Sequence, residues 1–583
     1  MYAAAAASGG PEDRLYTGCG QRGQCTIAVM KTAIVVAATF FALGCRAPAP
    51  PNSSADATTS TSPVPNAGIL PGVGAHHHPI ATTNPDAQKF FDQGMALVFG
   101  FNHEEATRSF QRAAELDPRA PMPHWGIAWS VGPNYNLDID DPRATRAFEA
   151  IDTAKKLSVN GSPVERDYVA AMAMRYSPDL KADRPALARR YSEAMADLVR
   201  RYPEDLDAAT LYAESLMTLR PWKLWTLDGK PADDTLRILA VLESVLKRAP
   251  NHMGANHFYI HAVEASTSPE RALPSAARLE TLAPAAGHLV HMPAHIYART
   301  GDHAAAAKAN LAGANADRVY LKNMPPDTFY GMAYYSHNLH FLADSHMMQG
   351  RLAEAQQAAT ELSERLLPHA DMMPMIESMA VSPLNVLMRF GRHQDILDQV
   401  SPPTNRPVMM AWWHFARGVA QARLQRVEEA ENERAQLRDA SARVPESALF
   451  GGSGLESARN VITIAGLVLD ARIAEARRQN DAAIAAWTNA AAAADRVAYD
   501  EPPVWFYPVR ESLGAALLRA GRSAEAEGVF REDLVRHPRN ARSLLGLREA
   551  LVQQKKNADA AWIDTQFREA WKNADSKVTV DDL

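Results

Sequence analysis

Histidine is concentrated in one stretch of this sequence. Ten of the 19 histidines lie between His252 and His346, where an even distribution would place about three. They fall in three segments, NHFYIHAVEAS (256–266), GHLVHMPAHIYARTGDH (287–303) and SHNLHFLADSH (336–346). Neutral imidazoles accompanied by carboxylates are ligands for borderline divalent metal ions. This stretch is therefore the first candidate for chemistry.

The spacing of these histidines predicts that each segment presents them on one side of a helix. His257 and His261 are four residues apart, and Glu264 follows three residues later. The segment 288–295 repeats the pattern with intervals of three and four. Residues at these intervals are neighbours on a helix surface. Pro293 is expected in the first turn of that helix, which would leave the two histidines before it at the helix entrance.

The elements that must position these side chains belong to a repeat. Alanine-rich sequence with 7% aromatic residues favours helix, and no alternating strand pattern appears. Two units 420 residues apart carry small and large apolar residues at matching offsets: Phe90, Gly94, Leu97, Ala106, Phe110, Ala113 and Pro118, then Gly514, Leu517, Gly521, Ala526, Phe530 and Pro538. The pattern resembles the tetratricopeptide (TPR) repeat. It implies an all-α, TPR-type α-solenoid of about ten helical hairpins with a concave groove, with turns near Gly301, Gly350, Gly391, Gln425 and Arg478 and a capping helix near 541–572.

Resemblance to TPR proteins implies that the second, fifth, ninth and twelfth positions of each unit face the concave groove. Counting from the repeat boundaries set by Pro250, Pro284 and Gly350, three units place seven histidines and two acids there: His257, His261, Glu264, His288, His291, His295, His337, His340 and Asp344. Packing alone has no reason to select imidazole at these positions. We therefore expect a shared ligand site, either for a metal ion or for an anionic or aromatic ligand in a histidine-lined pocket.

The donor set predicts a transition metal, Zn, Fe or Cu, bound by these histidines and Asp344, in a mononuclear or a dinuclear site. If the protein is an enzyme, it would be a metal-dependent oxidoreductase or hydrolase, with Glu264 as proton shuttle. The alternative is a scaffold that binds a partner protein or peptide in the same groove without metal. The wider pattern also resembles large exported bacterial TPR lipoproteins.

Two further acids are expected to face the groove. Glu214 takes an inward position if Pro203 closes a unit, and a solvated position on the helix is the alternative. The RPWKLW insertion after it (220–225) could cover the groove. Glu511 lies at another inward position, although a surface ion pair with the neighbouring Arg510 is the simpler interpretation.

Composition and motifs exclude several functions. The net charge of −6 leaves no basic footprint for nucleic acid. The sequence has no HExxH helix, GxSxG elbow, P-loop or dinucleotide-binding glycine pattern. All three cysteines lie at or before Cys45, so thiolate metal sites are not expected in the rest of the chain.

The N-terminal region predicts export. Residues 1–45 combine a leader with an apolar run that ends in Ala42-Leu43-Gly44-Cys45, which resembles a lipoprotein signal with Cys45 as the acylated residue. A plain secretory signal is the alternative. Residues 46–84 have the Pro/Ser/Thr-rich composition of a disordered tether, 85–575 form the repeat body and 576–583 a frayed tail. We expect a periplasmic or cell-surface lipoprotein held to the membrane by its lipid alone.

Overall fold

The computed structural model describes residues 67–371 and 376–583, which belong to one unit, Pro63–Leu583. The leader, its lipoprotein-type signal and Cys45 lie outside these residues. The first helices are α1 (Pro85–Phe99), α2 (His103–Leu116), α3 (Met122–Val131), α4 (Asp141–Leu157), α5 (Pro163–Ala173), α6 (Arg184–Arg201), α7 (Leu206–Met217), α8 (Thr235–Arg248), α9 (Met253–Val263) and α10 (Leu273–Leu282).

The second part of the chain is also helical. It comprises α11 (Gly287–His291), α12 (Pro293–Arg299), α13 (His303–Leu321), a π-helical turn (Gly331–Tyr335), α14 (Ser336–Met348), α15 (Leu352–Leu366), α16 (Glu377–Ala380), α17 (Ser382–Arg389), α18 (His393–Leu397), α19 (Pro407–Arg423), α20 (Val427–Ala442), α21 (Ala458–Ala476), α22 (Asn480–Ala494), α23 (Val509–Arg519), α24 (Ser523–Arg536), α25 (Ala541–Gln553) and α26 (Asn557–Ala570). One short antiparallel pair of strands, β1 (Leu449–Phe450) and β2 (Glu456–Ser457), precedes α21.

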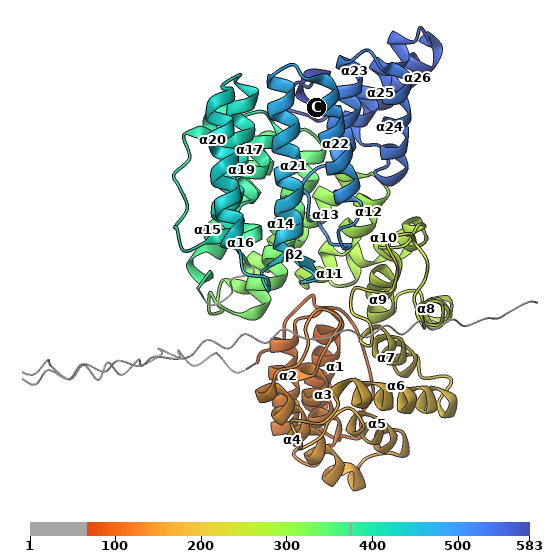
Figure 1. The fold of residues 1–583 in the computed structure, drawn as a ribbon. Helices are drawn as coiled ribbons and strands as arrows, with labels where there is room; N and C mark the ends of the chain where they lie inside the picture. The colour runs from red at the N-terminus through yellow and green to blue at the C-terminus, as the bar shows by residue number, and fades with distance from the viewer. Residues whose placement is uncertain (1–66, 372–375) are drawn as a thin grey trace, which may run out of the picture. The chain divides into compact units, whose positions relative to one another are not determined.

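The helices pack as consecutive pairs, which confirms the all-α, TPR-type α-solenoid of helical hairpins. α1 packs on α2, α3 on α4, and the order continues to α25 on α26 (Figure 1). The region expected to be a single capping helix is the pair α25 and α26. Successive pairs also contact each other, so a continuous core forms that no single pair could bury.

Glycine and phenylalanine set the close approach of neighbouring helices. Phe110 on α2 fills the space that a side chain at Gly94 or Gly126 would need. Phe530 on α24 does the same between Gly514 and Gly546. Gly94, Phe110, Gly514 and Phe530 are among the small and large positions on which the TPR resemblance rests.

The turns between paired helices lie where the sequence predicts them. All five have a positive φ, a conformation that glycine adopts without strain: Gly301 (80°), Gly350 (76°), Gly391 (64°), Gln425 (61°) and Arg478 (59°).

Both ends of the predicted repeat body differ from expectation. Residues 67–84, assigned to a disordered tether, pack on the helices: Val73 and Ile80 are buried, and Gln93 on α1 hydrogen-bonds the backbone of Gly68 and Leu70. The tail, expected to fray, ends in a 3-10 turn (Val580–Asp582), and Leu583 is buried. At both ends, apolar side chains pack into the core of the helical body. Amino-acid composition alone does not predict this packing.

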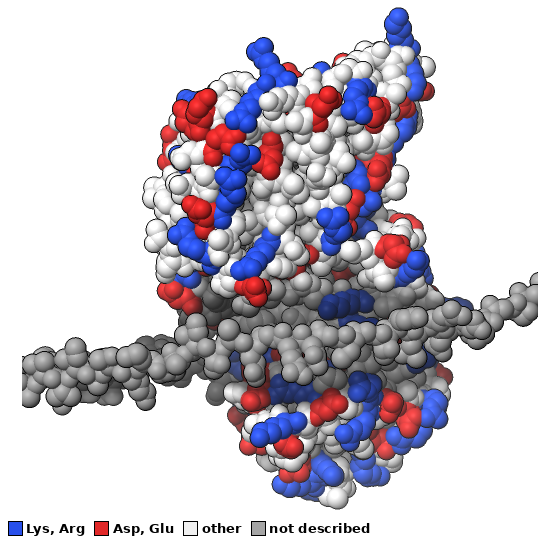
Figure 2. Space-filling model, in the orientation of Figure 1, with Lys and Arg blue, Asp and Glu red and all other residues white. Residues whose placement is uncertain are grey.

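The described surface is mixed in charge. On the face shown in Figure 2, acidic and basic side chains alternate over the helices without a large area of one sign. Among the described residues, no helix has the length and apolar character needed to span a membrane.

Candidate metal centre

Six histidines from four helices form two adjacent groups. His291 on α11, His295 on α12 and His337 on α14 make up what we call the first histidine set. The second histidine set consists of His257 and His261 on α9 and His288 on α11. Within each set, every residue has one ring nitrogen within 4.8 Å of one from each of the other two. The helix that sequence spacing predicts over 288–295 is interrupted at Met292, where α11 ends before Pro293 begins α12.

The first histidine set converges through its Nε2 atoms. The Nε2 atoms of His291 and His295 are 2.8 Å apart, and Nε2 of His337 is 3.4 Å from that of His295. The Nδ1 atoms point outward. Nδ1 of His291 lies 2.6 Å from Oδ1 of Asn310 on α13, and Nδ1 of His295 lies 2.9 Å from Oε2 of Glu264. Because a carboxylate and an amide oxygen accept, both Nδ1 atoms donate.

Two rings of the second histidine set have the same orientation. Nδ1 of His257 donates to the carbonyl oxygen of Phe99 at 2.6 Å, and Nδ1 of His261 donates to Oε1 of Glu264 at 3.0 Å. Nε2 of His288 lies 3.2 Å from Nε2 of His257. Nε2 of His261 is buried and finds no hydrogen-bond partner among the described residues.

Two buried carboxylates lie next to the two histidine sets. Glu264, immediately after α9, uses one oxygen for His261 and the other for His295, so it joins the two sets from outside. Glu501 contacts Nδ1 of His295 as well, from the loop before α23. Burial, with the nearby charge of Glu264, raises the pKa of Glu501 well above its usual value. Sequence reasoning missed Glu501, which no periodic pattern marks.

The site is enclosed, so the predicted groove-facing positions do not line an open surface. His257, His291 and His295 are at most 1% exposed. The ring of Phe101 stacks on His261 and His288, and that of Phe341 meets His291 and His295 edge-on. The half-buried Trp222, from the predicted covering insertion, lies with its ring centroid 6.2 Å from that of His261.

Burial favours the neutral form of five of these rings. It lowers the pKa of His257, His288, His291, His295 and His337 well below the usual value for histidine, and neighbouring histidines add to the effect. Neutral imidazole is the form that binds metal.

The last two residues of the predicted set lie further along α14. His340 and Asp344 share a helix side with His337, but neither belongs to the groups of converging donors within the described residues. Burial lowers the pKa of His340 to about 4 and raises that of Asp344 to about 7.

The two additional acids lie elsewhere. Glu214 on α7 is buried with its carboxylate 3.9 Å from Arg175. Glu511 on α23 is buried and forms an ion pair with Arg389. The surface pair expected between Glu511 and Arg510 is therefore wrong, because Arg510 turns to Asp495 at 2.6 Å.

A separate histidine cluster surrounds Asp207 on α7. Nδ1 of His78 lies 2.7 Å from one carboxylate oxygen, while Nε2 of His252 and of His76 lie 3.0 and 3.2 Å from the other. His252 also caps α9, accepting from the backbone N–H of Ala255. The cluster attaches residues 67–84 to α7 and α9. His76 and His78 come from the segment that the sequence assigns to a tether, and in the structure this segment packs on the helices.

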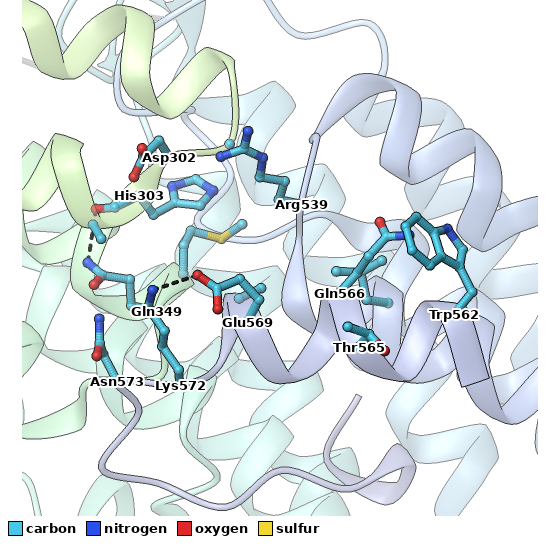
Figure 3. Close-up of a pocket in the computed structure, with 15 residues that line it drawn as sticks. Asp302, His303, Gln349, Arg539, Trp562, Thr565, Gln566, Glu569, Lys572 and Asn573 are labelled. Atoms are coloured by element: carbon cyan, nitrogen blue, oxygen red, sulfur yellow. Dashed lines mark hydrogen bonds and ion pairs between the residues drawn. The ribbon is translucent and has the colours of Figure 1, made fainter. Parts of the chain in front are cut away.

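One cavity is lined by none of the residues of either histidine set. It encloses about 450 Å³ between the α12–α13 turn and helices α25 and α26. Figure 3 shows His303, Arg539 and Glu569 around it, with Trp562 at one side. None of the converging imidazoles lines it, so it is not the candidate metal centre.

Comparisons with known proteins assign no family to this chain. No family model matches the chain, and no curated protein matches it. Solved structures of human IFIT1 are similar: the dimer with m7Gppp-AAAA has 13% identity and a TM-score of 0.31, covering 84% of this chain and 91% of that one. A monomeric IFIT1 mutant with Gppp-AAAA gives 14% identity, the same TM-score and the same coverage. Likeness at this level carries no argument about function.

Proposed function

We propose that this helical-repeat protein binds a transition metal ion through the first histidine set, His291, His295 and His337. One observation carries the proposal: the Nε2 atoms of His291 and His295 face each other at 2.8 Å, while the Nδ1 atom of each ring lies against an oxygen atom, which favours the tautomer protonated on Nδ1. Two bare nitrogen lone pairs at this separation repel unless a cation lies between them.

A proton is the weaker candidate for that cation. Adding one would create an imidazolium inside a buried cluster, and burial already lowers the pKa of both rings. A divalent metal fits the dimensions better. Nitrogens bound at about 2.0–2.1 Å in tetrahedral geometry lie roughly 3.3 Å apart, which matches the observed 3.4 Å. The 2.8 Å pair corresponds to a smaller N–metal–N angle of about 90° at the same bond length.

The donor chemistry limits the metal. The first histidine set offers only imidazole nitrogen, with carboxylates behind it, and no cysteine follows Cys45 in the sequence. Zn, Fe and Cu suit such donors, whereas Mg and Ca prefer oxygen.

The residues around the set support ligand geometry. Glu264 and Asn310 accept from the outer nitrogens of His295 and His291, which fixes the tautomer and the ring orientation. Both oxygens of Glu264 are engaged by histidines, so positioning is the role its contacts support. The aromatic enclosure excludes bulk water.

Metal analysis of the purified full chain tests the proposal. The wild type should retain at least one equivalent of transition metal per chain after native purification or reconstitution. The double variant His291→Ala/His295→Ala should lose at least one equivalent while keeping its helix content by circular dichroism. Less than about 0.2 equivalents in the wild type under both conditions would contradict the proposal and favour a metal-free scaffold for a protein or peptide.

We propose also that the chain is exported and anchored through a lipid on Cys45, on the basis of the sequence Ala42-Leu43-Gly44-Cys45. Mass spectrometry of the mature N-terminus checks this. A mature chain that begins at an acylated Cys45 is expected, and an unmodified terminus elsewhere would contradict it.

A further inference from the structure

We infer that the second histidine set, His257, His261 and His288, binds a second transition metal cation, so that the centre is dinuclear. This inference rests on the proposed function of the first histidine set. The argument for it uses a different set of ring nitrogens, which have too few protons to satisfy one another by hydrogen bonds.

The shortage follows from the hydrogen bonds of two rings. His257 gives its Nδ1 proton to the carbonyl oxygen of Phe99, and His261 gives its Nδ1 proton to Glu264. In neutral imidazoles this leaves two bare Nε2 atoms. His288 can supply at most one proton from its own Nε2, which lies 3.2 Å from Nε2 of His257.

One nitrogen therefore remains unpaired. The His261 side chain is only 2% exposed, and its Nε2 atom has no hydrogen-bond partner in residues 67–371 and 376–583. A buried acceptor with no partner is unfavourable and rare in folded proteins. A cation bound by all three Nε2 atoms would satisfy them together, and the converging nitrogens of the three residues lie within 4.8 Å of one another.

The two sets are close enough to form one centre. The ring centroids of His261 and His295 are 5.6 Å apart, and those of His288 and His291 are 5.7 Å apart. Helix α11 contributes one histidine to each set, three residues apart. Glu264 accepts from one ring of each set, so its single negative charge is shared between the two metal positions.

The surroundings favour cations over a neutral cluster. Glu264 and Glu501 both lie against His295, and in the described structure no arginine or lysine hydrogen-bonds either carboxylate. Arg299 is close enough for its charge to act on Glu264, but it donates to the backbone carbonyl of that residue. Two buried acids need a counter-charge or a proton. Two divalent cations would supply that charge, and six imidazoles would supply neutral donors around them.

The stoichiometry of metal binding tests this. The full chain, stripped with a chelator, is dialysed against Zn²⁺, and in parallel against Cu²⁺, and bound metal is counted by mass spectrometry. We expect two equivalents for the wild type. The variant His257→Ala/His288→Ala should bind one, and the variant His291→Ala/His337→Ala should also bind one.

A matched control addresses the separate Asp207 cluster. His76→Ala/His78→Ala should still bind two equivalents, because these residues belong to neither set. Loss of one equivalent in this control, with the His257/His288 variant still binding two, would place the second metal at Asp207 and overturn the inference.

The wild-type count separates the two proposals without relying on any variant. One equivalent that survives in His257→Ala/His288→Ala overturns the second metal and leaves the first intact. No bound metal overturns both. A wild-type count of one that both double variants abolish would mean a single ion shared by the two sets, which also overturns the dinuclear centre.

Discussion

His337 and His340 lie three residues apart on α14, and the repeat pattern predicts that both face the groove. The structure separates them: Nε2 of His337 faces the first histidine set, while His340 belongs to no group of converging donors among the described residues. We predict that His337→Ala weakens metal binding at least about tenfold, the lower end of what even an outer partner contributes. His340→Ala should change affinity less than twofold.

Competition with a chromophoric chelator measures both affinities under the same conditions. Because the two variants remove the same side chain from one helix, a general loss of helix stability would affect both. Equal weakening in the two variants would show that His340 is a ligand and that the assignment from geometry is wrong.

A second prediction at the residue scale concerns His103. Its buried ring nitrogens have no well-formed hydrogen bond among the described residues, and burial outweighs a backbone contact with Ser130 and lowers the pKa of His103 to about 3. Between pH about 6.5 and 3, the unfolded chain binds a proton here that the folded chain excludes, so this contribution to stability declines as pH falls below about 6.5, by up to ~1.4 kcal/mol per pH unit. The variant His103→Phe should therefore lose less stability on acidification than the wild type.

Thermal unfolding of both proteins at pH 7.5, 6.5 and 5.5, in the presence of a chelator, provides the comparison. The quantity compared is the slope of stability against pH. A constant difference in stability caused by the larger phenylalanine does not change this slope. Parallel slopes would show that the His103 ring is protonated in the folded state or does not titrate differently on unfolding.

At the scale of helices, close packing in each hairpin depends on a small residue. A side chain at Gly514 would overlap the ring of Phe530, whereas one at Gly528, on the exposed side of α24, meets nothing within 4 Å. We predict that Gly514→Ala destabilises the protein by about 1–3 kcal/mol through overpacking. Gly528→Ala should be neutral or stabilise it by up to ~1 kcal/mol, because alanine favours helix.

Denaturant titrations of the two variants compare the same chemical change in different surroundings. A stabilised Gly514→Ala variant would mean that the α23–α24 contact is looser than the structure indicates.

Sequence reasoning recovered the helical elements well because their signals are local. Glycine at Gly301 and Gly350 marks turns with positive φ, and the alternation of Gly94 with Phe110 marks a close helix contact. The break between α11 and α12 was only partly anticipated. Pro293 signalled a helix start, but the histidines before it form a short helix of their own and still reach the site.

The candidate site could be predicted less completely from the sequence. The repeat positions brought out all six histidines of the two sets, but they also included His340 and Asp344, because side-chain direction over several turns depends on helix packing. Glu501 could not be found, since it approaches His295 from 206 residues away in the chain through a loop without a periodic pattern. The Asp207 cluster depends likewise on contacts between residues 67–84 and two helices.

At the scale of the whole molecule, the candidate centre joins distant parts of the described chain. Helices α9, α11, α12 and α14 and the loop before α23 all contribute to it. A metal that binds only the folded state stabilises it by about 2.7 kcal/mol at a free concentration 100 times the Kd. We predict that Zn²⁺ raises the Tm of the stripped wild type by more than that of His291→Ala/His295→Ala, because this variant keeps only the second histidine set.

Calorimetry with and without Zn²⁺ measures the two shifts. The variant His76→Ala/His78→Ala, which lies outside both histidine sets, should keep the wild-type response. Identical shifts in the wild type and the His291/His295 variant would place the stabilising metal elsewhere.

The most direct test of the metal assignment is anomalous diffraction from crystals of the metal-loaded chain, recorded on both sides of the absorption edge. The account predicts an anomalous peak about 2.0–2.1 Å from the Nε2 atoms of His291 and His295, with His337 as the third ligand. A peak only at the Asp207 cluster, or no peak near these histidines in fully loaded protein, would contradict it.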